Sequence, residues 1–369
     1  MGPHRRRART SRNQGRGRVT LTAPVLVETL SETARGEWAR YLETRKGATL
    51  FHDLRWLDAV AAAYGYRQFN LMARRGGAIV GILPLTLVAS PLLGRSLIST
   101  AFAVGGGIVA DDEEAARALG ARALELGRRN RVKYVELRGG PPPGEGYQEK
   151  AGVYASFEKE MPADPEAIRQ WLPRNRRAEV KKALRIDEPN ENSFRTSRRV
   201  GDFYKVYAPA VRNLGTPIMP KKFLTALKVN FGEDVDIALV EHHGEPIAGL
   251  FSFWRKDRVM PYYIGADAKA REIKAYDYLY YTLMRRAVER GIRIFDFGRS
   301  KVGSTHYDTK TYWGFEPTPL VYHVALVTAK ELPNVNPNNP KFERLVALWR
   351  KLPLPVANFL GPIVARNFP

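Results

Sequence analysis

The 369-residue chain contains no cysteine. This absence excludes disulfides, a thiolate nucleophile and cysteine metal ligands together, and it favours a reducing compartment. A secretory signal is missing as well, because the basic start MGPHRRRARTSRNQGRGR has no apolar stretch behind it. We therefore expect a cytoplasmic protein.

Acidic residues are few. The 38 Asp and Glu face 59 Lys and Arg, which gives a formal net charge of +21. The first 18 residues hold seven Arg and no acid, and the remaining 351 residues still carry a net charge of +14. A basic body favours a polyanionic partner: RNA, a phosphorylated substrate or an anionic membrane surface. Residues 1–20 are predicted to be a disordered basic tail.

A long apolar run covers residues 76–94, GGAIVGILPLTLVASPLLG, without a single charge. Its length alone would allow a membrane-spanning helix. However, Gly81, Pro84, Pro91 and many β-branched residues favour buried strands and turns. We predict core strands here.

One pattern occurs twice along the chain. Each copy reads as a strand, a polar glycine turn, a second strand, a glycine-containing strand end, a helix and another strand. The first copy runs from LMARRGGAIVGILPL (71–85) to VKYVELRGG (132–140), and the second from ALVEHHGEPIAGLFSF (238–253) to IRIFDFGRS (292–300). The repeat predicts two related α/β domains of mixed sheet, at residues 21–162 and 200–330.

The segments around the two copies complete the predicted organisation. Residues 154–161 and 320–327 are expected to be the last strands of the first and the second domain. Residues 163–199 read as a basic helical insertion broken at Pro173, and residues 331–369 as a helical C-terminal tail. The apolar side chains of this tail, Trp349, Leu352 and Phe359, are expected to pack onto the body, with a membrane surface as the alternative.

The repeated unit resembles the GNAT acyltransferase fold, and its tandem arrangement resembles the FemAB aminoacyltransferases. The second half is most similar to the FemAB-like branch associated with PEP-CTERM protein sorting and exopolysaccharide systems. Five segments carry this resemblance: VYAPAVRNLGTPIMPKKFLTAL (206–227), PYYIGA (261–266), FDFGRSKVG (295–303), YWGFEP (312–317) and LWRKLPLPVANFLGP (348–362).

The resemblance implies transfer of an aminoacyl or acyl group to an amine on a cell-envelope or exopolysaccharide-related acceptor. The donor would be aminoacyl-tRNA or acyl-CoA, with no tightly bound cofactor. The Arg-x-x-Gly-x-Gly/Ala loop with which GNAT enzymes bind the CoA pyrophosphate is absent, since residues 270–277 read AREIKAYD and residues 111–118 read DDEEAARA. Four acids at a predicted helix start repel a pyrophosphate, which favours aminoacyl-tRNA.

The segment FDFGRSKVGSTHYDTKTYWGFEP (295–317) is the candidate active site. Lys310 or Arg299 could neutralise a phosphate or an oxyanion, and Asp308 or His306 could accept a proton. The predicted catalytic residues are therefore Lys310, Asp308 and His306, and the predicted substrate-binding residues are Arg299, Ser300, Lys301, Tyr262, Tyr263 and Trp313. The resemblance implies a lysine at position 310, although its relatives have Gly-Thr-Gly where this chain has Gly303-Ser304-Thr305.

Simpler interpretations stand beside these. Asp308 would cap a short helix at 309–314 with Lys310 solvated, and the tyrosines would pack in the core. Backbone N–H groups for an oxyanion could come from GGGIV (105–109) or YYIGA (262–266), although GGG also suits a tight turn. No metal site is expected, because His242 and His243 face opposite ways on a strand. The alternative function is a non-catalytic RNA-binding or membrane-surface scaffold protein, with peripheral contact to the inner face of the membrane through the tail.

Overall fold

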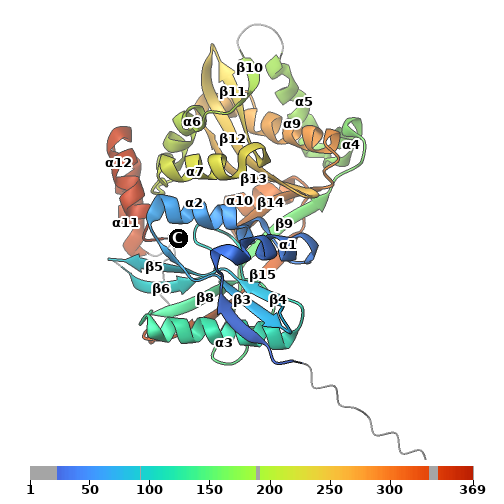
Figure 1. Cartoon of the computed structure of the whole chain (residues 1–369). Helices are drawn as coiled ribbons and strands as arrows, with labels where there is room; N and C mark the ends of the chain where they lie inside the picture. Colours follow the sequence, from blue (N-terminus) through green and yellow to red (C-terminus); the bar gives the residue numbers. More distant parts are fainter. Residues whose placement is uncertain (1–22, 92, 188–191, 332–339, 369) are drawn as a thin grey trace, which may run out of the picture.

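A computed structural model describes residues 23–91, 93–187, 192–331 and 340–368. The predicted basic tail, residues 1–20, lies outside them. The described part contains one long mixed sheet with the order β10-β11-β12-β13-β14-β9-β15-β8-β6-β5-β2 and a smaller sheet with the order β1-β3-β4-β7. Helices cover both ends of this arrangement (Figure 1). The predicted α/β architecture with a mixed sheet is confirmed.

The first unit holds eight strands and three helices of the described residues. Its strands are β1 (Leu26–Thr29), β2 (Arg67–Gln68), β3 (Leu71–Arg75), β4 (Ala78–Leu83), β5 (Thr86–Ser90), β6 (Gly94–Ile98), β7 (Val109–Ala110) and β8 (Tyr134–Arg138). Its helices are α1 (Arg35–Thr44), α2 (Leu54–Tyr64) and α3 (Glu113–Arg129). The apolar run 76–94 forms strands as predicted, and no described helix is long and apolar enough to cross a membrane.

The second unit repeats the order strand, strand, strand, helix, strand. Its strands are β10 (Asn192–Ser197), β11 (Val235–His242), β12 (Glu245–Arg255), β13 (Arg258–Ala266) and β14 (Ile294–Lys301). Its helices are α4 (Ile168–Trp171), α5 (Arg174–Ala183), α6 (Val200–Asn213), α7 (Lys221–Phe231), α8 (Ala268–Glu272), α9 (Ala275–Glu289) and α10 (Thr305–Tyr312). The predicted break at Pro173 separates α4 from α5, and both helices pack against α9. The predicted domain boundaries stay a prediction.

Two strands cross between the units. β9 (Gln148–Glu160) pairs antiparallel with β14 of the second unit, whereas β15 (Pro317–Leu326) pairs antiparallel with β8 of the first. β9 and β15 also pair with each other, so the long sheet runs through both units. The expectation that each strand closes its own domain is therefore wrong about the partners. Alternating apolar residues indicate a strand but not its neighbour, because either sheet edge offers the same backbone groups.

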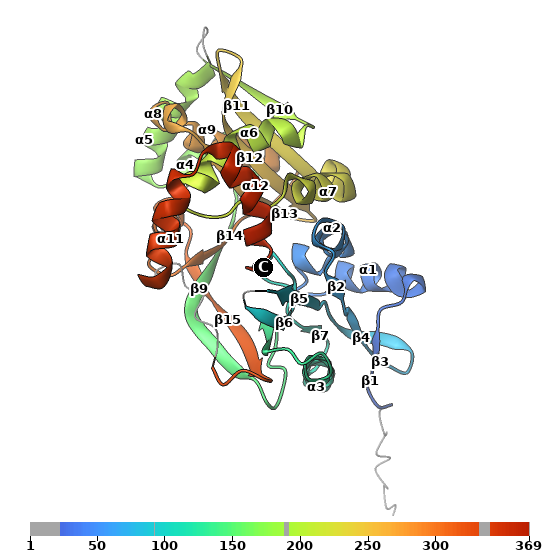
Figure 2. The same ribbon diagram turned by 90° about the vertical axis from the view of Figure 1, so that its left-hand side faces the viewer.

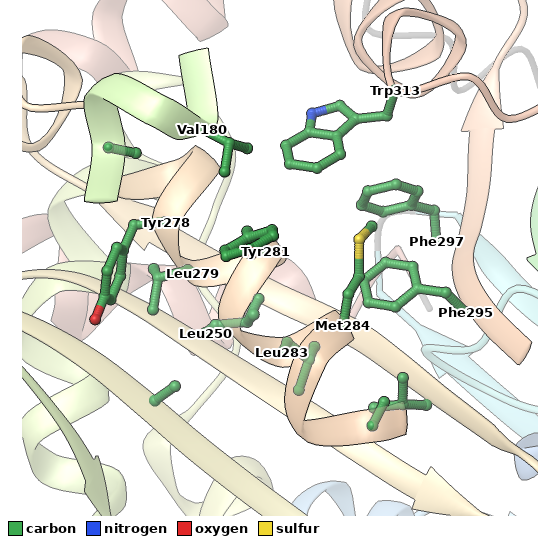
Figure 3. Close-up of a cluster of buried hydrophobic side chains, with 14 of the residues drawn as sticks. Val180, Leu250, Tyr278, Leu279, Tyr281, Leu283, Met284, Phe295, Phe297 and Trp313 are labelled. Carbon is green, nitrogen blue, oxygen red and sulfur yellow. The ribbon is translucent and has the colours of Figure 1, made fainter. Parts of the chain in front are cut away.

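The core of the second unit lies between the sheet and α9. Phe295 and Phe297 of β14, with Trp313 beyond α10, face Tyr281 and Met284 of α9 (Figure 3). Trp313 is 2% exposed, and its ring lies edge-on to Tyr280, with the ring centroids 5.5 Å apart. This packing fixes the start and the end of the polar segment 298–312 on buried aromatic rings.

The predicted helical C-terminal tail forms α11 (Pro340–Lys351) and α12 (Leu354–Ala365), which are separated at Pro353. It lies on one side of the molecule and touches both units (Figure 2). Arg212 of α6 donates to the carbonyl oxygen of Leu352 at 2.9 Å, and Ser90 of the first unit donates to the buried Asn367 at 2.8 Å. Trp349 and Leu352 are half-buried, but Phe359 is 73% exposed. The expected packing onto the body therefore fails for Phe359.

Candidate active site

The parallel strands β13 and β14 separate shortly after they meet. Their ladder holds two residue pairs, Arg258 with Ile294 and Val259 with Phe295. Beyond it, β13 bulges at Tyr262, because Phe251 pairs with Tyr263 and Ser252 with Pro261. The bulged YYIGA strand is therefore present, and a bulge re-aims side chains and frees backbone groups from the ladder.

β14 carries a bulge of its own. Asp296 pairs with Glu158 and Gly298 with Phe157, which leaves Phe297 without a partner in β9. Gly298 has a φ of +66°, a conformation that glycine adopts without steric cost. Its N–H turns back and donates to Asp296 Oδ1 at 2.8 Å. The kink places the carboxylate of Asp296 and the carbonyl groups of residues 298 and 299 beside α10.

α10 begins one turn earlier than the simpler interpretation predicts. Ser304 is its N-cap, since its hydroxyl accepts a hydrogen bond from the N–H of Tyr307 at 3.3 Å. Asp308 lies inside the helix and is exposed, so the prediction that it caps a helix at 309–314 is wrong. Because the helix starts at residue 305, residue 310 falls on the side that faces β14.

Lys310 turns inward from this helix. Its ammonium donates to the carbonyl oxygens of Arg299 at 2.9 Å and Gly298 at 3.2 Å. The nitrogen also lies 5.3 Å from the ring centroid of Phe157 in β9. A protonated lysine has three N–H donors, so two are used here and the third has no acceptor among the residues that the structure describes. Lys310 is therefore not a solvated surface residue.

Lys310 and Asp296 shift each other's titration. Burial lowers the pKa of Lys310 to about 8, although the charge of Asp296 opposes this. Burial raises the pKa of Asp296 to about 6, against the Gly298 N–H and the charges of Arg258 and Lys310. The two groups thus titrate on either side of neutral pH, which suits proton transfer.

Arg299 lies at the junction of the two units. Its Nη1 donates to the hydroxyl of Tyr322 on β15 at 2.6 Å, and its guanidinium stacks on the ring of Tyr154 on β9 at 4.1 Å. Among the described residues, no carboxylate forms an ion pair with Arg299. A half-buried guanidinium with spare donors and no acidic partner favours a bound anion.

A loop of the first unit completes the junction. The hydroxyl of Tyr262 donates to the carbonyl oxygen of Phe102 at 3.1 Å, and that of Tyr322 donates to Val104 at 3.1 Å. Arg138 holds the same loop from below, because its Nη1 donates to Thr100 and to Ala103. The hydroxyl groups of Tyr262 and Tyr322 thus hydrogen-bond to the backbone of the first unit.

The GGG segment of that loop is a packed turn. The N–H of Gly107 donates to the carbonyl oxygen of Arg138 at 3.0 Å, and the carbonyl oxygen of Gly107 contacts His52 Nε2 at 2.8 Å. A Cβ at residue 107 would lie 1.9 Å from the oxygen of Gly139. The Gly107 N–H is therefore already used, which leaves the β13 bulge as the better source of free donors.

Among the remaining predicted residues, Tyr262 belongs to the site. The charges of Arg299 and Asp296 act on the pKa of its hydroxyl, so these three residues belong together with Lys310. Ser300 and Tyr263 are buried, and their hydroxyl groups have no hydrogen-bond partner among the described residues. Lys301 ends β14, and its carbonyl oxygen accepts from Ser304 at 2.7 Å.

His306 and Trp313 stand apart from this centre. The histidine is on the outer side of α10, where partial removal from water and the charge of Lys310 lower its pKa. The tryptophan is core, so it cannot line a binding site without unfolding the segment around it (Figure 3).

Sequence reasoning missed Tyr322, Tyr154 and Arg138. The first two lie on the exchanged strands, whose partners the sequence pattern does not give. One signal was available for the third: the repeat aligns Glu136 with Asp296, and Glu136 is the acid that pairs with Arg138 at 2.9 Å. Asp296 holds the equivalent position in the second copy, and its charge acts on the pKa of Lys310.

The helix starts that would face a CoA pyrophosphate are occupied by acids. At α9, Asp277 is buried and accepts from Arg176 of α5 at 3.2 Å, and burial raises its pKa. At α3, Arg75 pairs with Asp112 at 2.6 Å and with Glu114 at 2.6 Å. Carboxylates thus take the place that a phosphate would need at both helix N-termini.

Comparison with known proteins supports this architecture. Residues 166–309 match the model of the acetyltransferase (GNAT) domain family. The crystal structure of FemX aligns with a TM-score of 0.62 at 13% identity, covering 82% of this chain and 98% of FemX. A tandem GNAT protein from the clavulanic acid biosynthesis pathway aligns at 0.55 and 15% identity, covering 83% of this chain and all of that one.

A conserved protein of unknown function from Bacteroides thetaiotaomicron aligns with a TM-score of 0.57 at 11% identity, covering 82% of this chain and 99% of that one. The search of curated proteins finds no match. Residues 166–309 are thus similar to the GNAT acetyltransferase domain family, and the tandem GNAT-like fold is confirmed.

Proposed function

We propose that the chain is an acyltransferase of the FemAB and GNAT type, which transfers an aminoacyl or acyl group to an amine. One observation carries the proposal: where β13 and β14 separate, the buried carboxylate of Asp296 and the half-buried ammonium of Lys310 come close enough for each charge to act on the pKa of the other, and Lys310 uses two of its three donors among the described residues. Asp296 lies within residues 166–309, which match the GNAT domain family, and Lys310 directly follows them.

The chemistry needs a proton acceptor and a site for negative charge. The amine nitrogen attacks the carbonyl carbon of the donor, and the bond to the leaving oxygen or sulfur breaks. Asp296, with a pKa of about 6, is ionised at neutral pH and can take the amine proton. The free N–H of Lys310 and the guanidinium of Arg299 stabilise the developing oxyanion.

We infer aminoacyl-tRNA as the donor. Both helix starts that would bind the CoA pyrophosphate carry carboxylates, and the net charge of +21 suits a large polyanion. The acceptor we propose is an amine on a cell-envelope or exopolysaccharide precursor, in keeping with the resemblance to the PEP-CTERM-associated branch. The reaction would take place at the inner face of the membrane.

Charged tRNA and acyl-CoA, each labelled in the acyl group, test the proposal with a panel of amine acceptors. We expect label transfer from charged tRNA with the wild type, a loss with Lys310→Ala, and unchanged transfer with the exposed control Lys46→Ala. Equal activity of wild type and Lys310→Ala, or no transfer from any donor, would show that the assignment is wrong.

The high positive charge favours one alternative, a non-catalytic RNA-binding protein. Its affinity for RNA would fall steeply with salt and survive changes at residues 299–310. The acyl-transfer proposal instead expects Arg299→Ala to lower kcat for transfer from charged tRNA at constant salt.

A further inference from the structure

Helix α12 buries its small residues and exposes its large apolar ones, which is the reverse of the usual pattern in a compact domain. It buries small residues, Ala357, Gly361 and Ala365, and turns large apolar ones outward: Phe359 is 73% exposed and Ile363 54%. A Cβ at residue 361 would lie 2.7 Å from the side chain of Ile218, so the small side of the helix is closely docked. Burying small residues and exposing large ones gives away hydrophobic stabilisation unless the outer side meets an apolar partner.

The outward residues form a continuous surface. Val356, Phe359 and Ile363 follow the helical spacing of three and four, and α11 adds the exposed Leu345 and Leu348. Both helices lie on the same face of the molecule (Figure 2). Residues 340–369 hold five Lys and Arg against one acid, so the segment that carries this apolar face is net basic. Such a combination matches the interface of an anionic membrane.

A pocket opens next to this face, between α6 and the start of α12. Its volume is about 460 Å³, and Lys205, Lys221 and Arg199 line it together with Tyr204, Leu354 and Asn358. Within the described residues, neither Lys205 nor Lys221 forms an ion pair with a carboxylate. Asp202 also lines the pocket, but its carboxylate accepts from Ser197 at 3.1 Å and from Arg195 at 3.3 Å. In addition, Asn358 Oδ1 is buried and finds no hydrogen-bond partner in the described part of the chain.

We propose that α11, α12 and this pocket form a membrane-docking face for anionic phospholipid. Phe359 and Ile363 enter the acyl boundary of the bilayer, while Lys205, Lys221 and Arg199 hold the phosphate of one headgroup. The inference goes beyond acyl transfer, since it rests on a different part of the molecule. It accounts for the exposed phenylalanine, for the unpaired lysines and for the charge around them with one partner.

Co-sedimentation of the full chain with vesicles tests the proposal, using phosphatidylcholine with and without phosphatidylglycerol. We expect binding to the anionic vesicles alone. The double variant Phe359→Ser with Ile363→Ser should weaken binding by at least about tenfold. Each substitution removes an apolar side chain that would be buried in the acyl region of the bilayer. Lys205→Gln with Lys221→Gln should weaken binding by about 25-fold, at about 1 kcal/mol per charge, which is about fivefold each.

The matched controls are Leu26→Ser, another apolar residue that is 68% exposed, and Lys46→Gln, an exposed lysine away from the tail. Both should bind as the wild type does. Undiminished binding of the Phe359 and Ile363 variant would overturn the proposal, because charge alone would then suffice. A lysine variant that loses affinity for RNA but not for vesicles would overturn it as well, because the pocket would then belong to RNA.

Failure here is separable from failure of the proposed function. The Phe359 and Ile363 variant should transfer acyl groups to a water-soluble amine at the wild-type rate, whereas Lys310→Ala should bind vesicles at the wild-type level. Circular dichroism should show that each of these variants keeps the fold.

Discussion

Lys310 donates a hydrogen bond to the main-chain carbonyl of Arg299 at 2.9 Å, so one cation is held in place by the backbone of the other. The kink at Gly298 makes this possible, because it turns two successive carbonyl oxygens toward α10. The arrangement gathers two positive charges at the separation of β13 and β14, where a reacting carbonyl group would develop negative charge.

Lys310→Met should separate charge from packing. Methionine keeps an unbranched apolar stem against Phe157 but has no ammonium group. We expect kcat to fall by about 10²- to 10³-fold, the usual effect of removing one oxyanion donor, with KM little changed. Steady-state kinetics with charged tRNA measure this, and a change confined to KM would contradict a transition-state role.

The pH dependence of kcat/KM should be bell-shaped. Activity should rise as Asp296 loses its proton near pH 6 and fall as Lys310 loses its proton near pH 8. Asp296→Asn should remove the lower limb together with most of the activity. A lower limb that stays near pH 6 in this variant would assign it to another group.

The same carboxylate should weaken the fold at neutral pH. Its folded pKa of about 6 lies above the unfolded value of 3.8, so the folded state binds the proton more tightly. Stability from this group is present below the unfolded pKa and is lost as the pH rises through about 6. Asp296→Asn should therefore raise the free energy of unfolding at pH 7 by up to about 3 kcal/mol, and denaturant melts at pH 7 measure it. A decrease would mean that the ion pair with Arg258, at 3.8 Å, and the charge of Lys310 outweigh the cost of burial.

Two neighbouring aromatic residues should differ sharply in their contribution to stability. Trp313 is 2% exposed and packs between Tyr280 and Phe297, whereas Tyr312 is 59% exposed. Trp313→Ala should cost about 3–5 kcal/mol, and Tyr312→Ala should stay within about 0.5 kcal/mol. Urea unfolding of both variants checks the difference, and similar values would contradict the buried position of Trp313.

Gly107→Ala should disturb the contact between the units. The added Cβ would lie 1.9 Å from the carbonyl oxygen of Gly139. This atom belongs to the backbone, so it cannot move aside as a flexible side chain could. We expect a lower melting temperature and a loss of activity through displacement of the loop below Tyr262 and Tyr322. Gly36→Ala is the control: its Cβ meets nothing closer than 3.9 Å inside α1, so it should stabilise the protein by about 0.5–1 kcal/mol.

The sequence predicted most elements of this fold and part of its site. The repeated order of strands and helix and the break at Pro173 follow from local patterns, whereas the tandem GNAT fold was implied by a resemblance. The exchange of β9 and β15 does not, because strand partners depend on contacts far apart in the chain. Lys310 and Arg299 were predicted as site residues, but the role of Asp296 depends on the kink at Gly298, and Tyr322 arrives on an exchanged strand.

The exchanged strands also bear on how the protein is made. One edge of β8 pairs with β15, a strand that is synthesised near the end of the chain. Until then the first unit exposes an unpaired sheet edge, which is prone to pair with other chains. Neither repeat can complete its sheet before the other is made. The two repeats, although each has its own core, should therefore fold and unfold together.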